Sequence, residues 1–222
     1  MNRTIDAAIF DMDGTLLDTM RYWRYTTLEF LLAHQMPVRQ EDLLRMHDTS
    51  SRRLLKDIAR RENLDIGTPD EVVQELEAFM NRHYLYDAKM KADVPALLEM
   101  LRERGIRMCV ATGSPREYAR NGLGRLEILD YFEFVTDHYE DHMSKEQPEY
   151  FYNVARRLGT TPERCVVFED ALYSMESAKK AGCKVVAIED DTARLQREAI
   201  QKVADRYITS YAELLAPDGW RL

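Results

Sequence analysis

Long apolar runs and basic clusters are both scarce in this sequence of 222 residues. Its longest mainly apolar runs, such as Ala7 to Phe10 and Cys165 to Phe168, fall far short of the roughly 20 residues that cross a bilayer. The chain start also lacks the apolar region and cleavage site of a secretory signal. We therefore expect a cytoplasmic protein without a membrane span.

Basic side chains are outnumbered, with 31 Lys and Arg against 39 Asp and Glu, and the formal net charge is −8. Nucleic-acid binding needs a basic face that neutralises phosphates, and no Lys/Arg block is present. The composition therefore argues against nucleic acid as a partner. The net negative charge of the protein would repel an anionic ligand. Binding such a ligand would therefore need a local feature that makes the electrostatic potential positive at the site.

Cysteine is rare, and the three cysteines do not form a closely spaced pair. They are Cys109, Cys165 and Cys183, which lie far apart in the chain. An odd number without close spacing argues against a disulfide framework and against a zinc cluster. We expect three buried thiols that pack as small hydrophobic groups.

Glycine and proline number only 9 and 7, which favours much helix and few long loops. Short apolar strands are expected at 5–10, 106–111, 133–136, 165–168, 184–188 and, more weakly, 207–208. Helices are expected between them, at 95–104, from 115, at 148–158, 171–181 and 192–203. This alternation predicts an α/β fold, a Rossmann-like parallel sheet with helices on both faces.

The stretch from Thr19 to about Met90 contains no strand pattern and repeats apolar residues at helical spacing. Its clearest helix begins at Thr68, with Pro69 in the first turn and Glu71 placed for a capping box. We predict an all-helical domain at 18–89, inserted after the first strand of an α/β core formed by 1–17 and 90–222.

Acidic and hydroxyl side chains follow three of the predicted strands, at the sheet edge where ligands of open α/β folds bind. They are Asp11 and Asp13 after the first strand, Thr112-Gly113-Ser114 after the second, and Glu169-Asp170 after the fourth. Four carboxylates at one edge are stable only with a shared proton or a cation. Because the donors are all oxygens, Mg²⁺ is the favoured ion.

Ser114 and Pro115 also have the pattern of a helix start, with Ser114 as N-cap and Pro115 as the first helical residue. The free N–H groups of such a helix end favour an anion. Together with the hydroxyls of Thr112 and Ser114, they predict a phosphate site opposite the acidic cluster.

In combination, these features resemble the haloacid dehalogenase-like superfamily of phosphotransferases. The resemblance implies that the helical domain at 18–89 is a cap and that 1–17 with 90–222 form the catalytic core. The matching segments are Ile9-Phe10-Asp11-Met12-Asp13-Gly14-Thr15-Leu16-Leu17-Asp18-Thr19, Val110-Ala111-Thr112-Gly113-Ser114, and Val166-Val167-Phe168-Glu169-Asp170 followed by Ala178 to Gly182. The third motif of the family is matched by Lys145, although Glu146 follows it where proline is usual. In the fourth motif, Ala171 and Ser174 replace the usual serine and glycine.

The resemblance implies catalytic roles for three side chains. Asp11 would attack phosphorus and form an aspartyl-phosphate. Asp13 would protonate the leaving oxygen and then activate water. Lys145 would neutralise charge on the nucleophile and the phosphate.

The resemblance also implies a Mg²⁺ site made by Asp11, Asp170 and the backbone carbonyl of Asp13, with Glu169 assisting directly or through water. The residues implied for binding the phosphoryl oxygens are Thr112, Gly113 and Ser114.

Two further groups of residues have both a functional and an ordinary interpretation. In the predicted cap, a basic group of residues forms either a solvated helix face or a substrate contact, for which Arg52 or Arg53 is the candidate. The group consists of Arg45, His47, Arg52, Arg53 and Lys56. His138 and His142 have the spacing of a metal pair on a helix, but their acidic neighbours favour a solvated segment.

We therefore predict a Mg²⁺-dependent phosphatase for a small phosphorylated metabolite, of the sugar phosphate or phosphoglycolate type, as a monomer or homodimer. One alternative is a sugar phosphomutase of the β-phosphoglucomutase type; such enzymes usually carry a histidine where Trp23 stands here, which favours hydrolysis. A second alternative is a non-catalytic binding module on the same fold.

Overall fold

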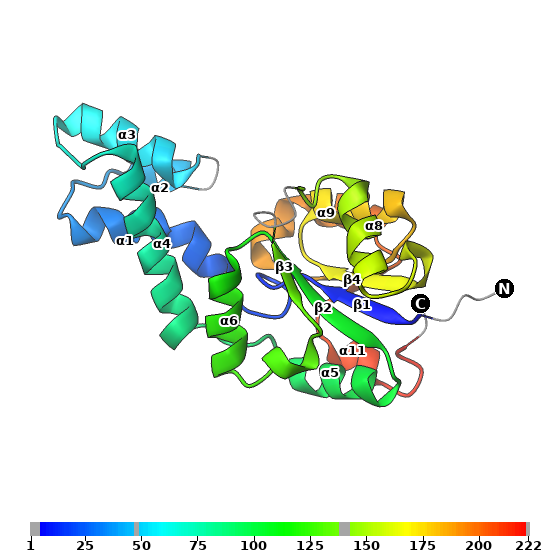
Figure 1. Ribbon diagram of the computed structural model, residues 1–222. Coiled ribbons are helices and arrows are strands. Elements are labelled where there is room, and N and C mark those ends of the chain that lie inside the picture. The colour runs from blue at the N-terminus through cyan, green and yellow to red at the C-terminus, as the bar shows by residue number, and fades with distance from the viewer. Residues whose placement is uncertain (1–4, 47–48, 138–142, 221–222) are drawn as a thin grey trace. The chain divides into compact units, whose positions relative to one another are not determined.

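The computed structural model describes residues 5–46, 49–137 and 143–220. The chain divides into two compact units, one formed by Met1–Asp18 with Ala88–Leu222 and the other by Thr19–Asp87 (Figure 1). The second unit is therefore an insertion that leaves the first one just after its first strand and returns about 70 residues later, a length of chain that suffices for a small helical domain.

The first unit is built on one six-stranded sheet in the order β3-β2-β1-β4-β5-β6, and each pair of neighbouring strands is parallel. Its strands are β1 (Ala7–Phe10), β2 (Arg107–Thr112), β3 (Val135–Asp137), β4 (Cys165–Glu169), β5 (Lys184–Ile188) and β6 (Arg206–Ile208). The central strands are buried along almost their whole length because both sheet faces are covered, as their unbroken apolar runs predict. The expected α/β fold class is confirmed.

Helices cover both faces of this sheet (Figure 1). On one face, α8 (Pro148–Arg157), α9 (Leu172–Ala181) and α10 (Arg197–Val203) pack on a core that includes Ile9, Cys109 and Val167. On the other, α5 (Val94–Glu103), α6 (Arg116–Arg125) and α11 (Ala212–Leu215) lie against the sheet. The three cysteines are buried free thiols, as expected.

Some predicted element boundaries are corrected. The first and third strands begin at Ala7 and Val135, each two residues later than predicted, and the third strand ends at Asp137 rather than 136. The predicted helix at 192–203 begins as a 3-10 turn, Asp191–Gln196, and only Arg197–Val203 is α-helical. The Asp190 carboxylate accepts a hydrogen bond from the Thr192 backbone N–H and thereby caps that turn.

The register of the sheet places the carboxyl ends of β2, β1 and β4 beside one another. Phe10, the last residue of β1, is opposite both Val110 of β2 and Phe168 of β4. The chain continues from these positions into the loops that hold the polar motifs. Residues far apart in sequence therefore meet at one edge of the sheet.

The second unit contains α1 (Met20–Ala33), α2 (Gln40–Arg45), α3 (Ser51–Glu62) and α4 (Pro69–Tyr86). Its core is apolar and includes Phe30, Leu54, Leu55 and Val72. The predicted capping box is present at the start of α4, where Thr68 and Glu71 exchange side-chain and backbone hydrogen bonds. No helix in the described part of the chain is both long and apolar enough to cross a membrane.

Candidate active site

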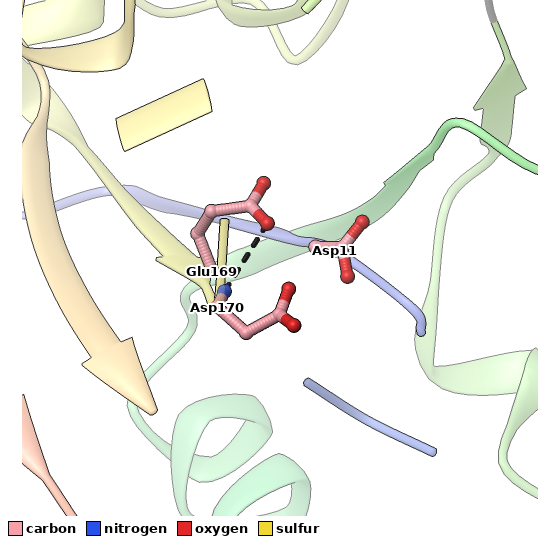
Figure 2. A group of neighbouring side chains, drawn as sticks. All are labelled: Asp11, Glu169 and Asp170. Atoms are coloured by element: carbon pink, nitrogen blue, oxygen red, sulfur yellow. Dashed lines mark hydrogen bonds between the residues drawn. The ribbon is translucent and has the colours of Figure 1, made fainter. Parts of the chain in front are cut away.

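A buried cluster of three carboxylates lies at the carboxyl edge of the sheet (Figure 2). Asp11 follows β1, Glu169 is the last residue of β4, and Asp170 comes directly after it. One ligand oxygen from each lies within 4.8 Å of the others, and the three residues are only 7%, 1% and 4% exposed. Parallel neighbouring strands thus place these acids side by side, as the sequence predicts.

Lys145 enters this cluster from the turn that precedes α8. Its Nζ lies 2.7 Å from Asp11 Oδ1 and 2.6 Å from Glu169 Oε2, and the side chain is 5% exposed. Burial acts to lower the pKa of this lysine, but the Asp11 and Glu169 carboxylates outweigh it and raise the pKa well above its usual range. The two carboxylates therefore favour the charged form of Lys145, and the side chain reaches the cluster although Glu146 follows it in place of proline.

One ammonium group does not balance three buried carboxylates. Burial and the neighbouring Glu169 raise the pKa of Asp11 to about 8, in spite of Lys145. Burial and Asp11 likewise raise the pKa of Asp170 well above its usual value. The cluster therefore favours either protons or a cation.

The donor set fits a hard divalent cation. Asp11 Oδ2 is buried and has no hydrogen-bond partner, whereas Oδ1 is held by Lys145. Glu169 Oε1 accepts hydrogen bonds from the backbone N–H groups of Asp170 and Ala171, which fixes the turn that bears Asp170. A buried, unpaired carboxylate oxygen beside two further carboxylates is typical of the ligand set of a hard cation.

Asp13 lies on a tight turn that begins where β1 ends. Gly14 has a φ of 82°, a conformation that is strained for residues with a side chain, and its N–H donates to the Leu17 carbonyl at 2.8 Å. The Asp13 carboxylate is partly exposed and accepts a hydrogen bond from Ser114 Oγ at 2.6 Å. Its side chain does not belong to the three-carboxylate cluster, so any part in metal binding falls to its backbone carbonyl, as the resemblance implies.

The segment Thr112-Gly113-Ser114 lies opposite Asp13 at the end of β2. Thr112 is fully buried, and its Oγ1 accepts a hydrogen bond from the Ser114 N–H at 3.0 Å. Gly113 is exposed. The structure therefore brings the predicted phosphate-binding segment and the predicted acid–base residue together.

The predicted helix start at this segment is wrong by one residue. Helix α6 begins at Arg116 with Pro115 as its N-cap, and Ser114 does not cap it because its hydroxyl is bonded to Asp13. The capping role falls to Asp137 at the end of β3, whose Oδ2 accepts from the Arg116 N–H at 3.0 Å.

Two tyrosines near the cluster had no signal in the sequence. The Tyr211 hydroxyl, contributed by the C-terminal segment before α11, is buried and donates to the Thr15 carbonyl at 3.2 Å, in the turn that follows Asp13. Tyr173 lies in the first turn of α9 and is about half exposed. Burial raises its pKa, while Lys145 lowers it, which places its phenol within electrostatic reach of the cluster.

Arg52 lies on the exposed side of α3 in the second unit, and its contact with a substrate stays a prediction. Arg45 of the same basic group forms an ion pair with Asp57, in line with a solvated helix face. Trp23 donates to the Tyr84 hydroxyl within the second unit. His47, His138 and His142 lie outside the described residues.

The sequence pattern of the family described as haloacid dehalogenase-like hydrolases matches residues 8–188 of this chain. The chain therefore belongs to that family, and the resemblance of its motifs is confirmed. The matched range includes the whole of the unit Thr19–Asp87 and most of the other unit, from residue 8 to residue 188. The carboxylate cluster, Lys145 and the segment Thr112-Gly113-Ser114 all lie within it.

Characterised relatives extend over most of the chain. A phosphorylated carbohydrates phosphatase from Thermotoga maritima is 29% identical over 212 residues, which cover 90% of this chain and 94% of that protein. The fructose-1-phosphate phosphatase YqaB from Escherichia coli is 30% identical over 182 residues, or 81% of this chain and 94% of that protein. The expected class, a phosphoric monoester hydrolase of this family, agrees with these relatives.

Solved structures confirm the fold. CbbY from Rhodobacter sphaeroides in complex with phosphate has a TM-score of 0.78 at 22% identity, covering 99% of this chain and 100% of that one. A putative β-phosphoglucomutase from Thermotoga maritima has a TM-score of 0.76 at 24% identity, covering 92% and 94%. At these identities the likeness extends to the fold, and phosphatases and mutases share it.

Proposed function

We propose that the protein is a Mg²⁺-dependent phosphatase that hydrolyses a small phosphorylated metabolite, of the sugar phosphate or phosphoglycolate type, through an aspartyl-phosphate on Asp11. The observation that carries this proposal is the environment of Asp11. One carboxylate oxygen is held by the Lys145 ammonium, while the other is buried, unpaired and beside Glu169 and Asp170. A purely structural aspartate would have both oxygens satisfied.

The residues that would hold Mg²⁺ are Asp11, Asp170 and the Asp13 backbone carbonyl, with Glu169 directly or through water. When bound, the ion would offset the carboxylate charge, keep Asp11 ionised and neutralise phosphoryl oxygens.

The remaining chemistry belongs to side chains of this chain. An Asp11 oxygen attacks phosphorus, and the bond from phosphorus to the ester oxygen breaks while Asp13 gives that oxygen a proton. Asp13 then takes a proton from water, which attacks phosphorus and releases inorganic phosphate and the free Asp11 carboxylate. Lys145 and the Thr112 hydroxyl stabilise the charge that spreads over the phosphoryl oxygens.

The substrate class follows the relatives, whose names specify phosphorylated carbohydrates and fructose 1-phosphate. We propose that the helical unit Thr19–Asp87 is the cap that closes over such a substrate and excludes water, with Arg52 as a contact for its polar part. Sugar phosphates are accordingly the first compounds to assay.

The test is phosphate release from sugar phosphates, phosphoglycolate, nucleotides and pyrophosphate, with and without Mg²⁺. Asp11→Asn should remove turnover and leave the far-UV circular dichroism spectrum unchanged. Asp6→Asn is the matched control, because Asp6 precedes the same strand at its other end and pairs there with Arg164; it should stay active. An Asp11→Asn variant with undiminished Mg²⁺-dependent activity would remove Asp11 as the nucleophile.

The same assay separates the alternatives. With β-glucose 1-phosphate, glucose 6-phosphate as the product would indicate a mutase, whereas free phosphate indicates a phosphatase. A wild-type protein that releases no phosphate from the whole panel would favour a non-catalytic binding module.

A further inference from the structure

Ser114 has two hydrogen-bond donors, and the structure uses both inside the candidate site. Its backbone N–H donates to Thr112 Oγ1 at 3.0 Å, and its hydroxyl donates to Asp13 Oδ2 at 2.6 Å. The residue is 6% exposed. Neither donor is therefore left over for a phosphate in this arrangement.

Each of these hydrogen bonds orients a partner of chemical importance. Because Thr112 Oγ1 accepts from Ser114, the hydroxyl proton of Thr112 is left to donate to another acceptor. The bond to Asp13 is short and involves a carboxylate, which makes it one of the stronger kinds of hydrogen bond. It fixes one carboxylate oxygen of a side chain that is only partly buried.

We propose that Ser114 is a positioning residue that holds the Asp13 carboxylate and the Thr112 hydroxyl in register, and that it is not itself a ligand of the transferred phosphoryl group. This inference rests on the proposed function, in which Asp13 is the acid and base and Thr112 binds phosphoryl oxygens. Asp13 follows β1 and Thr112 ends β2, so Ser114 links side chains from two different strands.

The competing role, in which the Ser114 hydroxyl binds phosphate, has a different kinetic signature. A serine hydroxyl has one proton and cannot donate to Asp13 and to a phosphoryl oxygen at once. A phosphate ligand contributes to binding of both substrate and inorganic phosphate, so its loss raises KM and the inhibition constant for phosphate. A group that positions the acid and base acts mainly on kcat.

The kinetic experiment compares Ser114→Ala and Ser114→Thr with the wild type on the best sugar phosphate from the panel. General acid–base catalysis contributes about 10²- to 10⁴-fold, so a loosened Asp13 should lower kcat by about 10- to 50-fold. KM and the inhibition constant for inorganic phosphate should stay within about twofold. Ser114→Thr keeps the hydroxyl and should recover most of the lost kcat.

Ser177→Ala is the matched control, because Ser177 is equally buried but its hydroxyl has no hydrogen-bond partner in the described part of the chain. It should leave kcat within about twofold of the wild type. If Ser114→Ala instead raises KM and the phosphate inhibition constant by tenfold or more at unchanged kcat, the hydroxyl is a phosphate ligand and the proposal is wrong.

A second measurement does not depend on activity. In a double-mutant cycle of Ser114→Ala and Asp13→Ala, urea denaturation of the metal-free protein reports the coupling between the two side chains. A hydrogen bond to a carboxylate should make the two effects non-additive by about tenfold in the folding equilibrium constant. Additive effects would refute the Ser114–Asp13 contact. Absence of phosphate release by the wild type would refute the proposed function, and the cycle would still decide whether Ser114 holds Asp13.

Discussion

Replacing Lys145 by methionine tests the electrostatic design of the carboxylate cluster. The substitution keeps an unbranched side chain of similar length and removes the single ammonium that contacts Asp11 Oδ1 and Glu169 Oε2, at 2.7 and 2.6 Å. Both contacts are buried, so water cannot replace them in the variant. The loss of folding free energy in the variant should therefore depend on whether another cation is bound by the cluster.

The expected loss is set by the cost of leaving buried charge uncompensated. Removing one partner of a buried ion pair typically costs about 3–5 kcal/mol of folding free energy. Asp11, whose pKa is about 8, is already largely protonated at pH 7 without metal, so less charge is left uncompensated and the expected loss is at the lower end, about 3 kcal/mol. In Mg²⁺ the deficit should shrink, because a cation no longer repelled by Lys145 binds more tightly, and a tenfold gain in affinity is worth about 1.4 kcal/mol.

Urea denaturation in EDTA and in saturating Mg²⁺ measures the loss of folding free energy without the ion and the part of that loss that the ion restores. A Trp23→Phe background leaves Trp220 as the fluorescent reporter, which stacks near Phe168 in the first unit with ring centroids 6.4 Å apart. The control is Lys184→Met, which removes a 44% exposed lysine paired with Asp205 and should cost under about 1 kcal/mol at any Mg²⁺ concentration. A loss below about 1 kcal/mol for Lys145→Met in EDTA, or equal losses with and without Mg²⁺, would refute the reasoning.

Three further results are expected. Asp11, with a pKa of about 8 without metal, and Asp170, whose pKa is also raised, must lose their protons when Mg²⁺ binds, so the apparent Mg²⁺ affinity should rise by at least about tenfold per pH unit from about pH 6 to 8; a flat profile in titrations would contradict this. Tyr211→Phe leaves the Thr15 carbonyl without its donor and should lower the free energy of unfolding by about 1–2 kcal/mol, as measured by urea denaturation. Hydrogen bonding from Arg61 lowers the pKa of Asp42 in the second unit, so this carboxylate stabilises the fold above about pH 4 and stops doing so as pH falls through its lower folded pKa. The stability advantage of the wild type over Asp42→Asn should accordingly be constant at neutral pH and narrow below about pH 4, and a gap independent of pH would exclude this role.

The parts of the site that could be predicted are those carried by strand ends. Asp11, Thr112 and Glu169 each close an apolar run, and in a parallel sheet the closing residues of neighbouring strands must converge. No knowledge of loop structure is needed for that step. The capping box at Thr68 was equally accessible because its donors and acceptors lie within one helical turn.

The parts that could not be predicted depend on contacts between segments far apart in the chain. The sequence pattern predicts that Ser114 caps the helix, but its hydroxyl donates instead to Asp13, 101 residues away. The Asp137 carboxylate accepts the hydrogen bond from the first turn of that helix. Tyr211 reaches Thr15 across 196 residues, and nothing in the local pattern of either segment signals it. Local pattern indicates which groups are available, whereas tertiary structure decides between competing partners.

The acidic composition and the preference for an anionic substrate are reconciled by the charge of the cluster itself. Three carboxylates and one ammonium leave two negative charges when all are ionised, and the raised pKa values of Asp11 and Asp170 express the cost of that state. In the proposed function, a divalent cation would cancel this charge where the phosphoryl group binds. Without the ion, the same residues would hold protons and Asp11 would be a poor nucleophile. On this proposal the acids of the cluster are a condition for binding a phosphate ester, since they would recruit the cation that the anion needs.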